Sequence, residues 1–577
     1  MARSKPKAKK AKEGGGSPAS IFLRHALLNA LQHGGKADAG AVMGKVLAES
    51  PALRKDIASA REGAEKAAGV ANGMTAEEQE SMLREMVPDA LRPVKREKQG
   101  LPELEGAVEG MVVTRFAPCP SGPLNVLHAL RAVLLSYMYA RMYKGKFILR
   151  FEDTDPAPGK ILKEFYGMIR EDLRFLGADW DEEAVESSDM AEFYAYAEEL
   201  IRKGHAYVDF TPAEEFRRLK LEKKDPESRP ATPQENMDAW KGMLAGKYSE
   251  GQAVLRFKTS MQDPNPAFRD PAIFRIAAGE HPLAGRKYAV WPLYNFANVV
   301  EDHKAGVTHV FRGKEHEHNS HIQGRICKAL GWSPPNVLNF GMIYLPGTKD
   351  HTRDIKEKIG KGIYSGWDDP RLHTLAALRR RGFQGKAFQE CAVVAGLSKT
   401  DIRFSMESLE TANRKIIDPL ANRYMAVFDP VRISLSGHPK AISSASEPLH
   451  PDFKERGSKQ MPVRFDSISI SGDDYARLEG GEFRLKGLAN VKLDGKQASY
   501  VGNELARDMQ KVQWVSVPNV SVELVVPEGE RLVIRKGMGE QAMSGLKPGS
   551  LIQMERVGFG RVDKVEKGRV VLYWAHK

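Results

Sequence analysis

The sequence predicts a multidomain α/β protein with a helical N-terminal domain, a parallel-sheet domain in the middle and β-barrels at the C-terminal end. Residues 18–95 carry apolar side chains at helical spacing, broken by Gly and Pro. Residues 111–153 alternate between β-rich and helical runs, and the chain beyond about residue 430 consists of short alternating runs between turn signals. The 577 residues provide for about three to five domains of ordinary size.

Residues 1–17 form a basic, low-complexity tail that ends in a run of glycines. The stretch 1–12 contains no acid and supplies half of the net charge of +12. Such a tail is typical of a disordered segment that contacts a polyanion such as RNA, and equally of one that only keeps a protein soluble. The other half of the charge is spread over the long body and gives only mild support for nucleic-acid binding.

The cysteines Cys119, Cys327 and Cys391 lie far apart and show no CxxC spacing, so the sequence predicts neither a disulfide framework nor a structural zinc site. No metal-binding residue is expected. No apolar run is long enough to cross a bilayer, and no apolar segment follows the basic N-terminus as it would in a secretory signal. We therefore expect a protein of the reducing cytoplasm without a membrane partner.

A βαβ unit begins at residue 111. The unit starts with a predicted strand, MVVTRF, followed by a loop, APCPSGPL. A predicted helix, NVLHALRAVLLSYMYARMYKG, then leads to a second predicted strand, KFILRFED. This order implies parallel strands joined by a right-handed crossover. Ligands of such sheets bind beyond the carboxyl ends of the strands, where the loop 117–124 and the acidic pair Glu152-Asp153 fall.

These segments also carry a specific resemblance. The first half of a class I glutamyl- or glutaminyl-tRNA synthetase active site resembles two successive segments of this chain, TRFAPCPSGPLNVLHALRA and GKFILRFEDTDP. The resemblance covers about residues 20–577 and continues through NPAFRDPAIFRI, KYAVWPLYNFANVVEDHKAGVTHVFRGKEH, GWDDPRLHTLAALRRRG and GFGRVDKVEKGRVVLYWAHK. In this family an all-β C-terminal part marks the archaeal and eukaryotic branch, and the chain is identified as resembling the archaeal-type glutamyl-tRNA synthetases.

The resemblance implies a domain plan. A class I Rossmann-type catalytic domain is expected at 108–365, with an inserted acceptor-binding subdomain at about 205–285. A helical domain at 18–95 precedes it, a helical connecting domain at 366–428 follows it, and the barrels at 429–577 are expected to bind the anticodon.

The resemblance also implies a glutamate pocket. Arg115 matches the arginine that faces the substrate carboxylates, and Glu152 matches the acid that receives the ammonium group. Tyr294 and Asn298 match polar lining groups, and Arg312 matches the residue that meets the side-chain carboxylate. Two arginines and one acid complement the charges of glutamate. Glutamine would leave part of a buried guanidinium unmatched, so glutamate is favoured over glutamine.

The expected ATP site departs from the family pattern. Where the family has His-x-Gly-His, this chain has Asn125, Val126, Leu127 and His128, so only the second histidine is kept. Asn125 and His128 are the expected catalytic residues, stabilising charge on the phosphates. Leu127 puts a branched side chain where the family leaves room for the purine. The expected ATP-binding residues of this segment are Pro118, Gly122, Leu127 and His128.

The family's second ATP motif, close to Leu-Ser-Thr-Ser-Lys, falls on residues 350–354. The phosphate-binding lysine is replaced by Asp354, and a carboxylate repels a triphosphate. Losing one oriented donor typically costs about 10²–10³ in rate. Lys349, Arg353 and Lys356 lie within a few residues and are the expected replacements.

The resemblance implies ATP with Mg²⁺ as a substrate, no tightly bound cofactor, and L-glutamate and tRNA(Glu) as partners, with tRNA(Gln) as a further candidate. Arg379, Arg380 and Arg381 match a part of the family near the tRNA, whereas without the resemblance they read as a solvated helix face. Two hypotheses stay open. The chain is an active glutamate–tRNA ligase, or it is a catalytically impaired paralogue that binds tRNA or glutamate.

Overall fold

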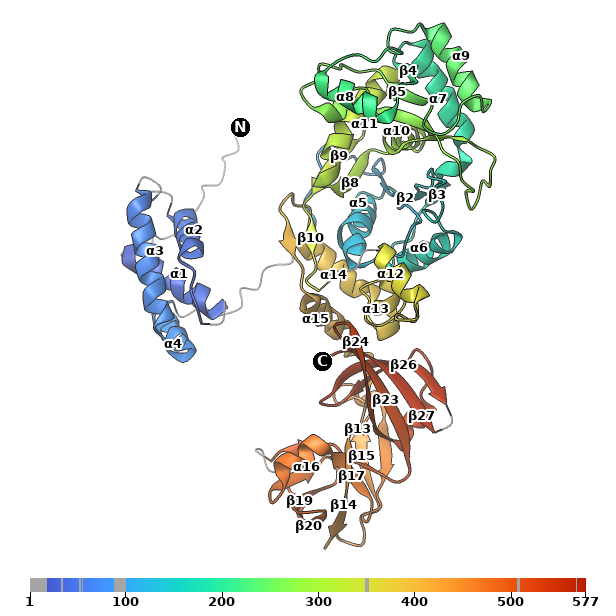
Figure 1. Ribbon diagram of the computed structural model, residues 1–577. Coiled ribbons are helices and arrows are strands. Elements are labelled where there is room, and N and C mark those ends of the chain that lie inside the picture. The colour runs from blue at the N-terminus through green and yellow to red at the C-terminus, as the bar shows by residue number, and fades with distance from the viewer. Residues whose placement is uncertain are drawn as a thin grey trace, which may run out of the picture. The chain divides into compact units, whose positions relative to one another are not determined.

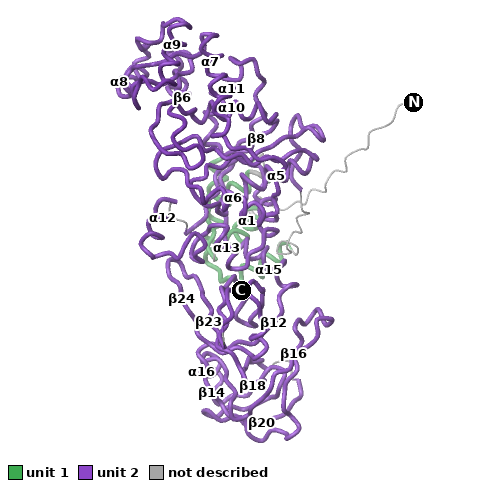
Figure 2. The backbone as a smooth tube through the Cα atoms, turned by 90° about the vertical axis from the view of Figure 1, so that its right-hand side faces the viewer, with its two compact units in different colours: residues 1–99 green, residues 100–577 purple. Residues whose placement is uncertain are grey.

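The computed structural model describes residues 18–32, 35–50, 53, 56–87, 100–347, 352–505, 509–566 and 568–577. The chain divides into two compact units, Met1–Gln99 and Gly100–Lys577, which Figure 2 colours separately. The predicted basic tail and Lys349 lie outside the described residues. Among the helices described, none has both the length and the apolar character needed to cross a membrane.

The first unit is a bundle of short helices. Capping side chains fix where its helices begin: Asp38 and Asp56 accept hydrogen bonds from backbone N–H groups, and Thr75 forms a capping box with Glu78. Small and aliphatic side chains close the core, among them Ala26, Leu27, Val46, Ala64 and Leu83. The helices are α1 (Pro18–Gln32), α2 (Ala39–Glu49), α3 (Ile57–Asn72) and α4 (Ala76–Met86).

The second unit begins with a parallel sheet. Strands β1 (Val113–Phe116), β2 (Lys146–Phe151) and β3 (Glu182–Val185) pair in parallel, as do β8 (His309–Gly313) and β9 (Asn336–Phe340). Three hydrogen bonds between Thr308 and Val113 place β8 beside β1. Figure 1 shows β8 next to its partner β9. The crossover helices are α5 (Leu134–Met142) and α6 (Lys163–Leu176), and α10 (Tyr294–Lys304) and α11 (Glu317–Leu330) follow later in the chain. The predicted fold class is confirmed.

The helix after β1 differs from the expected continuous α-helix. Residues His128–Val133 form a π-helical turn, in which the N–H of Leu134 donates to the carbonyl of Ala129, and α5 begins only at Leu134. A π-turn holds one more residue than an α-turn, so side chains before and after it change their relative direction. Such turns are rare and are frequent at functional sites. Apolar periodicity alone does not distinguish a π-turn from an α-turn.

An antiparallel subdomain is inserted between β3 and β8. Its sheet consists of β4 (Ala206–Asp209), β5 (Val254–Phe257), β6 (Ala272–Ile276) and β7 (Val290–Pro292), and so reaches beyond the expected limit near residue 285. Helices α7 (Met190–Arg202), α8 (Ala213–Glu222) and α9 (Pro233–Leu244) accompany this sheet. Trp240, Phe274 and Trp291 are completely buried in its core.

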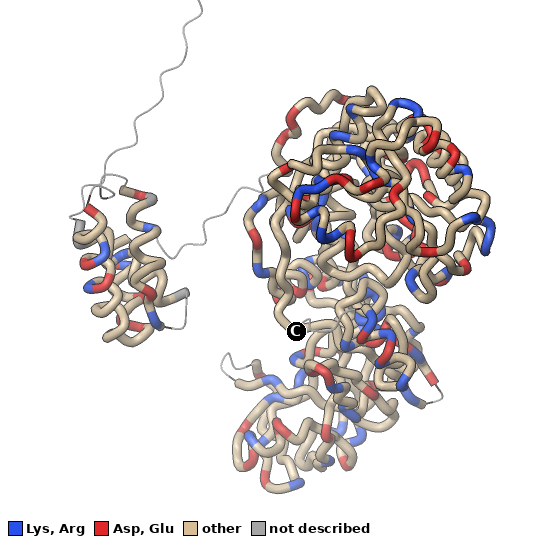
Figure 3. The backbone as a smooth tube through the Cα atoms, turned by 45° about the horizontal axis from the view of Figure 1, so that its top comes forward, with Lys and Arg blue, Asp and Glu red and all other residues tan. Residues whose placement is uncertain are grey.

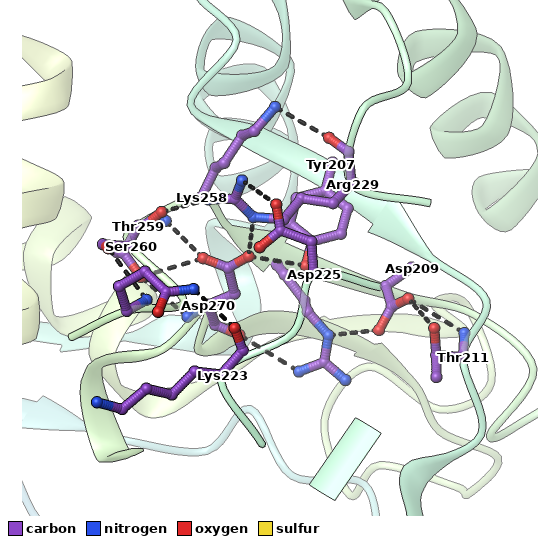
Figure 4. A network of polar contacts seen from close by, with 12 residues as sticks. Tyr207, Asp209, Thr211, Lys223, Asp225, Arg229, Lys258, Thr259, Ser260 and Asp270 are labelled. Carbon is purple, nitrogen blue, oxygen red and sulfur yellow. Dashed lines mark hydrogen bonds and ion pairs between the residues drawn. The ribbon is translucent and has the colours of Figure 1, made fainter. Parts of the chain in front are cut away.

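A buried polar network holds the loops of this subdomain (Figure 4). The carboxylate of Asp270, which is fully buried, accepts hydrogen bonds from the Tyr207 hydroxyl, the Arg229 guanidinium and the Thr259 backbone. Arg256 pairs with buried Asp209 in the same region. Since Tyr207, Arg229 and Thr259 belong to different segments, the carboxylate of Asp270 joins three parts of the chain.

We expect Asp270→Ala to destabilise the inserted subdomain by about 3–5 kcal/mol, because it leaves a partly buried guanidinium and a buried hydroxyl without their shared acceptor. Hydrogen exchange of the β5 and β6 amides measures this local free energy of opening. Asp225→Ala, which removes the exposed partner of the same Arg229, is the control and should change it by less than about 1 kcal/mol. Equal effects of the two substitutions would contradict the account.

A helical region links the sheet to the C-terminal barrels. It contains α12 (Thr352–Gly360), α13 (Leu375–Arg381), α14 (Gly385–Ala395) and α15 (Met406–Ile417). Strand β10 (Ile343–Tyr344) pairs with β11 (Ile402–Arg403) and ties this region to the end of the parallel sheet.

The C-terminal part consists of two seven-stranded sheets and a hairpin. The barrel strands begin at Asn422, ahead of the expected start at 429, because runs of three residues are too short to show a strand period. The strands of the first sheet are, in spatial order, β12 (Asn422–Tyr424), β25 (Leu551–Met554), β26 (Gly558–Glu566), β27 (Arg569–His576), β23 (Asn519–Glu528), β24 (Arg531–Glu540) and β13 (Ala426–Phe428).

The second sheet packs around Trp514, whose ring is buried and whose indole N–H donates to the Lys486 carbonyl. Its strands, in spatial order, are β21 (Lys511–Val512), β18 (Glu482–Leu485), β19 (Ala489–Asp494), β20 (Gln497–Gly502), β14 (Pro430–Ser436), β17 (Ile468–Ser471) and β22 (Val515–Ser516). The remaining elements are the hairpin β15 (Ser444–Pro448) and β16 (Ser458–Pro462) and the helix α16 (Gly472–Leu478).

Candidate active site

A cavity of about 540 Å³ opens at the carboxyl ends of β1, β2 and β8. This is where ligands of open parallel sheets bind. Eight of the residues that the sequence singles out line it: Arg115, Pro118, Gly122, Leu127, His128, Glu152, Tyr294 and Arg312.

One buried carboxylate organises the floor of this cavity. Asp302, on α10, accepts from Nε of Arg115 at 3.2 Å and from Nη1 of Arg150 at 2.6 Å. Burial alone would raise the pKa of Asp302, but the two guanidinium groups outweigh burial and hold it below its ordinary value. The charged Asp302 therefore allows two arginines from neighbouring strands to lie side by side.

Asn298 lies one layer behind the cavity and connects these groups. Its side-chain oxygen accepts from Nη2 of Arg115 at 3.0 Å and from Nη2 of Arg150 at 2.8 Å. Its amide nitrogen donates to Oε1 of Glu152 at 2.9 Å. Both ends of the amide are thus engaged, so Asn298 fixes the orientation of the Glu152 carboxylate without itself lining the cavity.

The guanidinium group of Arg312 is buried, and only one of its nitrogens forms a hydrogen bond to a described residue. Its Nη2 donates to the Ser320 hydroxyl, whereas its Nε and Nη1 have no hydrogen-bond partner among the described residues. Burial lowers the pKa of Arg312, with Tyr294 acting in the opposite direction. Buried donors without partners carry a free-energy cost that an anionic ligand removes. Among the cavity's charged groups, the set that the sequence predicts, Arg115, Arg312 and Glu152, suits a ligand with two carboxylates and one ammonium group.

On the side of the cavity expected to hold ATP, Asn125 and His128 cap the helical turn with hydrogen bonds to its backbone. Oδ1 of Asn125 accepts from the backbone N–H groups of Leu127 and His128, at 3.0 and 3.1 Å. Nδ1 of His128 accepts from the backbone N–H of Asn125 at 3.3 Å, so the ring proton of the neutral imidazole lies on Nε2. Asn is a preferred capping residue. Asn125 therefore shapes the turn and is not among the described cavity-lining residues.

Leu127 lines the cavity and also packs against the core of the parallel-sheet domain.

The loop before Leu127 has a glycine at a position where a side chain would collide with α12. A Cβ added to Gly122 would lie 2.6 Å from Cγ2 of Thr352, the first residue of α12. The start of α12 thus rests directly on the loop after β1.

The cations expected to replace the missing lysine lie elsewhere. The Arg353 side chain is 94% exposed and lies 4.0 Å from the Asp354 carboxylate. Lys356 is also exposed, and its Nζ would be 3.8 Å from a Cβ added to Gly159. Neither residue is among the described residues that line the cavity, and Lys349 is outside the described part of the chain.

Several cavity residues were not predicted. Arg131 is buried, donates through Nη1 to the Gly341 carbonyl, and has an Nε without a partner among the described residues. Cys119, Glu315 and His316 also line the cavity. A usable signal existed for Arg150, which lies behind the cavity. The segment KFILRFED reads as a strand in which Arg150 precedes Glu152 by two positions, which places both side chains on one face, although β2 itself ends at Phe151.

The three consecutive arginines of α13 do not form a free basic face. Arg379 lies 3.2 Å from the Glu171 carboxylate. Arg380 pairs with Asp563 at 3.1 Å and lies over the Tyr573 ring. Arg381 donates to two backbone carbonyls of β27, and burial lowers its pKa to about 10. Arg380 and Arg381 therefore bind the first C-terminal sheet. Basic and acidic positions are interspersed over the described chain (Figure 3).

The parallel sheet, its inserted antiparallel subdomain and the cavity at the strand ends agree with the layout of a class I synthetase catalytic domain. Residues 111–419 match the family model of tRNA synthetases class I (E and Q), catalytic domain, and residues 421–508 match the anticodon-binding domain of the same group. The chain belongs to this family, the class I tRNA synthetases for glutamate and glutamine.

Similar proteins extend over almost the whole chain. A glutamate–tRNA ligase of Pyrococcus abyssi is 43% identical over 576 residues, covering 96% of this chain and 99% of the relative. The glutamate–tRNA ligase of Thermococcus kodakarensis is 42% identical over 572 residues, with the same coverage of both chains. That of Methanothermobacter thermautotrophicus is 39% identical over 562 residues, again covering 96% and 99%.

We expect Asp302→Asn to weaken binding of L-glutamate, the expected ligand, by about 10- to 100-fold. The amide cannot balance both guanidinium groups, so Arg115 loses its fixed position. Isothermal titration calorimetry in the presence of tRNA measures the change. Asp238→Asn, on the exposed face of α9, is the matched control and should bind as the wild type does. Unchanged affinity in Asp302→Asn would show that this carboxylate does not organise the site.

Proposed function

We propose that this chain attaches L-glutamate to tRNA(Glu) in an ATP-dependent reaction that passes through glutamyl-adenylate. The observation that carries the proposal is the cavity at the strand ends, where Arg115, Arg312 and Glu152 converge and two N–H groups of Arg312 lack partners among the described residues. The archaeal relatives named above, which are glutamate–tRNA ligases, support it.

Each charged group has a role in this proposal. The Glu152 carboxylate, oriented by Asn298, receives the ammonium group of glutamate. Arg115 faces the carboxylates, and the free donors of Arg312 meet the side-chain carboxylate, with Tyr294 completing the wall. A glutamine amide offers Arg312 one oxygen acceptor, but its NH₂ group is a donor that would face the donors of the guanidinium group. Glutamine is therefore disfavoured because a buried donor stays unmatched.

The chemistry needs little from the protein beyond position and charge. An oxygen of the α-carboxylate forms a bond to the α-phosphorus of ATP as the bond to pyrophosphate breaks. A ribose hydroxyl at the end of tRNA then attacks the carbonyl carbon of the adenylate, and AMP leaves. In this proposal the Nε2–H of His128, which lines the cavity, donates to a phosphate oxygen, whereas the backbone N–H groups of Leu127 and His128 are engaged by Asn125.

Mg²⁺ enters this proposal with the nucleotide. Among the described residues, no group of three or more His, Cys, Asp or Glu side chains is arranged to hold a metal ion. The proposed steps therefore use Mg²⁺ only as the counterion of the ATP phosphates.

The remaining assignments follow from the family. We propose that the inserted subdomain holds the acceptor end of tRNA, that the C-terminal barrels hold the anticodon, and that the reaction takes place in the cytoplasm. tRNA(Gln) is a further candidate substrate. Of the α13 arginines, only Arg379 is proposed to contact tRNA, because Arg380 and Arg381 are engaged with the barrel.

A second candidate function is an impaired paralogue that binds tRNA or glutamate without making adenylate. Two observations favour it. The Leu127 side chain lines the cavity where the family has glycine, and Asp354 stands on α12 where the family has the phosphate-binding lysine. An eroded ATP site beside an ordered set of glutamate-binding groups is the arrangement such a paralogue would have.

Glutamate-dependent ATP–pyrophosphate exchange, measured with tRNA present, separates the two functions. An active ligase should exceed a His128→Ala variant by about 10²–10³, because that variant lacks one oriented donor to the phosphates. His25→Ala, in the first unit, is the control and should exchange as the wild type does. If the wild type and His128→Ala show the same background, the ligase proposal fails. Salt-sensitive retardation of tRNA by the same preparation would then support the paralogue.

A further inference from the structure

A second cavity, of about 360 Å³, lies behind the first one. Helices α10 and α11 form one side of it, and the chain before β8 and β9 forms the other. None of its described lining residues lines the first cavity. Its volume is in the range of small-molecule sites.

Two glycines leave this space open. Gly306 and Gly324 both line the cavity, and a Cβ added to either would meet no atom within 4 Å. Gly324 lies within α11, where every common residue except proline would favour the helix more than glycine does. The chain thus carries no side chain at a helical position where one would fit.

One polar group in the wall lacks a partner. Gln323 is 8% exposed, and its Nε2 has no hydrogen bond among the described residues. An amide nitrogen only donates, so the missing partner is an acceptor. Leaving such a buried donor unmatched costs free energy, which a bound ligand with an acceptor atom would recover.

The wall also restricts the charge of a ligand. No Lys or Arg is among its described lining residues, and its carboxylate is Asp302, which is already held by two arginines. An anion would meet that carboxylate with only the imidazole of His303, among the described lining residues, to offset the repulsion. Val299, Val307 and Val337 make the rest of the wall partly apolar, and His303, stacked on Trp332 at 3.8 Å, adds an aromatic surface.

Two residues of this wall also hold the arginines of the first cavity. Asp302 positions Arg115, and the hydroxyl of Ser320 accepts from Arg312. A molecule that contacts Asp302 or Ser320 would shift groups that the proposed substrate needs. The two cavities are therefore linked through direct hydrogen bonds, without any intervening element.

We propose that this second cavity binds a small uncharged amide or nitrogen heterocycle, whose acceptor atom bonds Nε2 of Gln323, and that its occupancy changes the affinity of the first cavity for glutamate. The binding part rests on the geometry of the cavity alone. The effect on glutamate rests on the proposed function.

Nicotinamide, which is uncharged and carries both an amide and a ring nitrogen, is the probe, and nicotinate is its anionic counterpart. We expect saturation-transfer NMR to show nicotinamide bound to the full chain and nicotinate at least tenfold weaker. Gly324→Met should abolish nicotinamide binding by filling the space. Gly167→Met is the matched control, because Gly167 is an exposed helical glycine with the same free space around its Cβ, and it should bind normally.

Gln323→Met tests the acceptor bond, since it keeps the length of the side chain and removes the donor. We expect at least a tenfold loss of nicotinamide affinity. Failure of the wild type to bind nicotinamide, or equal binding by Gly324→Met and Gly167→Met, would overturn the inference. Thermal unfolding of each variant shows whether a loss of binding reflects a loss of fold.

Glutamate titrations with and without saturating nicotinamide test the link, which must be reciprocal. A change in glutamate affinity that Gly324→Met abolishes supports it, and an unchanged affinity refutes it. Nicotinamide binding without any glutamate binding would instead refute the proposed function while leaving the second site in place.

Discussion

The site depends on one buried ion group, the carboxylate of Asp302 between Arg115 and Arg150. Two buried guanidinium groups on adjacent strands would repel each other. A buried charge is tolerated only when it is paired and hydrogen-bonded. Here Asn298 accepts a hydrogen bond from each arginine, and the buried Glu186 carboxylate lies 3.4 Å from Nε of Arg150. The same carboxylate forms part of the second cavity's wall, so it joins the two sites described above.

The short helix α13 joins the expected ATP loop to the C-terminal barrel. At its start, the N–H of Leu375 donates to the Leu124 carbonyl, and Val126 donates to the carbonyl of His373. At its end, Arg381 donates to β27. The turn that carries His128 is therefore anchored to the same helix that holds the barrel. This arrangement explains why two of the three arginines face the protein and not the solvent.

Much of the architecture could be predicted from local pattern. The βαβ unit placed Arg115 and Glu152 at strand ends, and the structure brings both to one cavity. The features that the sequence did not predict depend on residues far apart in the chain or on the exact backbone geometry of a turn. Arg150 and Asp302 are 152 residues apart, and no local pattern shows that they pair. The π-turn has the same apolar residues as an α-turn, and the role of Asn125 as a cap became visible only through its backbone contacts.

The most direct test of the account is a calorimetric comparison of L-glutamate with L-glutamine on the full chain, with and without tRNA. The charge arrangement around Arg115, Glu152 and Arg312 predicts heat of binding for glutamate and at least about a tenfold weaker response for glutamine, whose amide leaves a donor of Arg312 unmatched. Equal binding of the two amino acids, or no heat with glutamate under either condition, would contradict it.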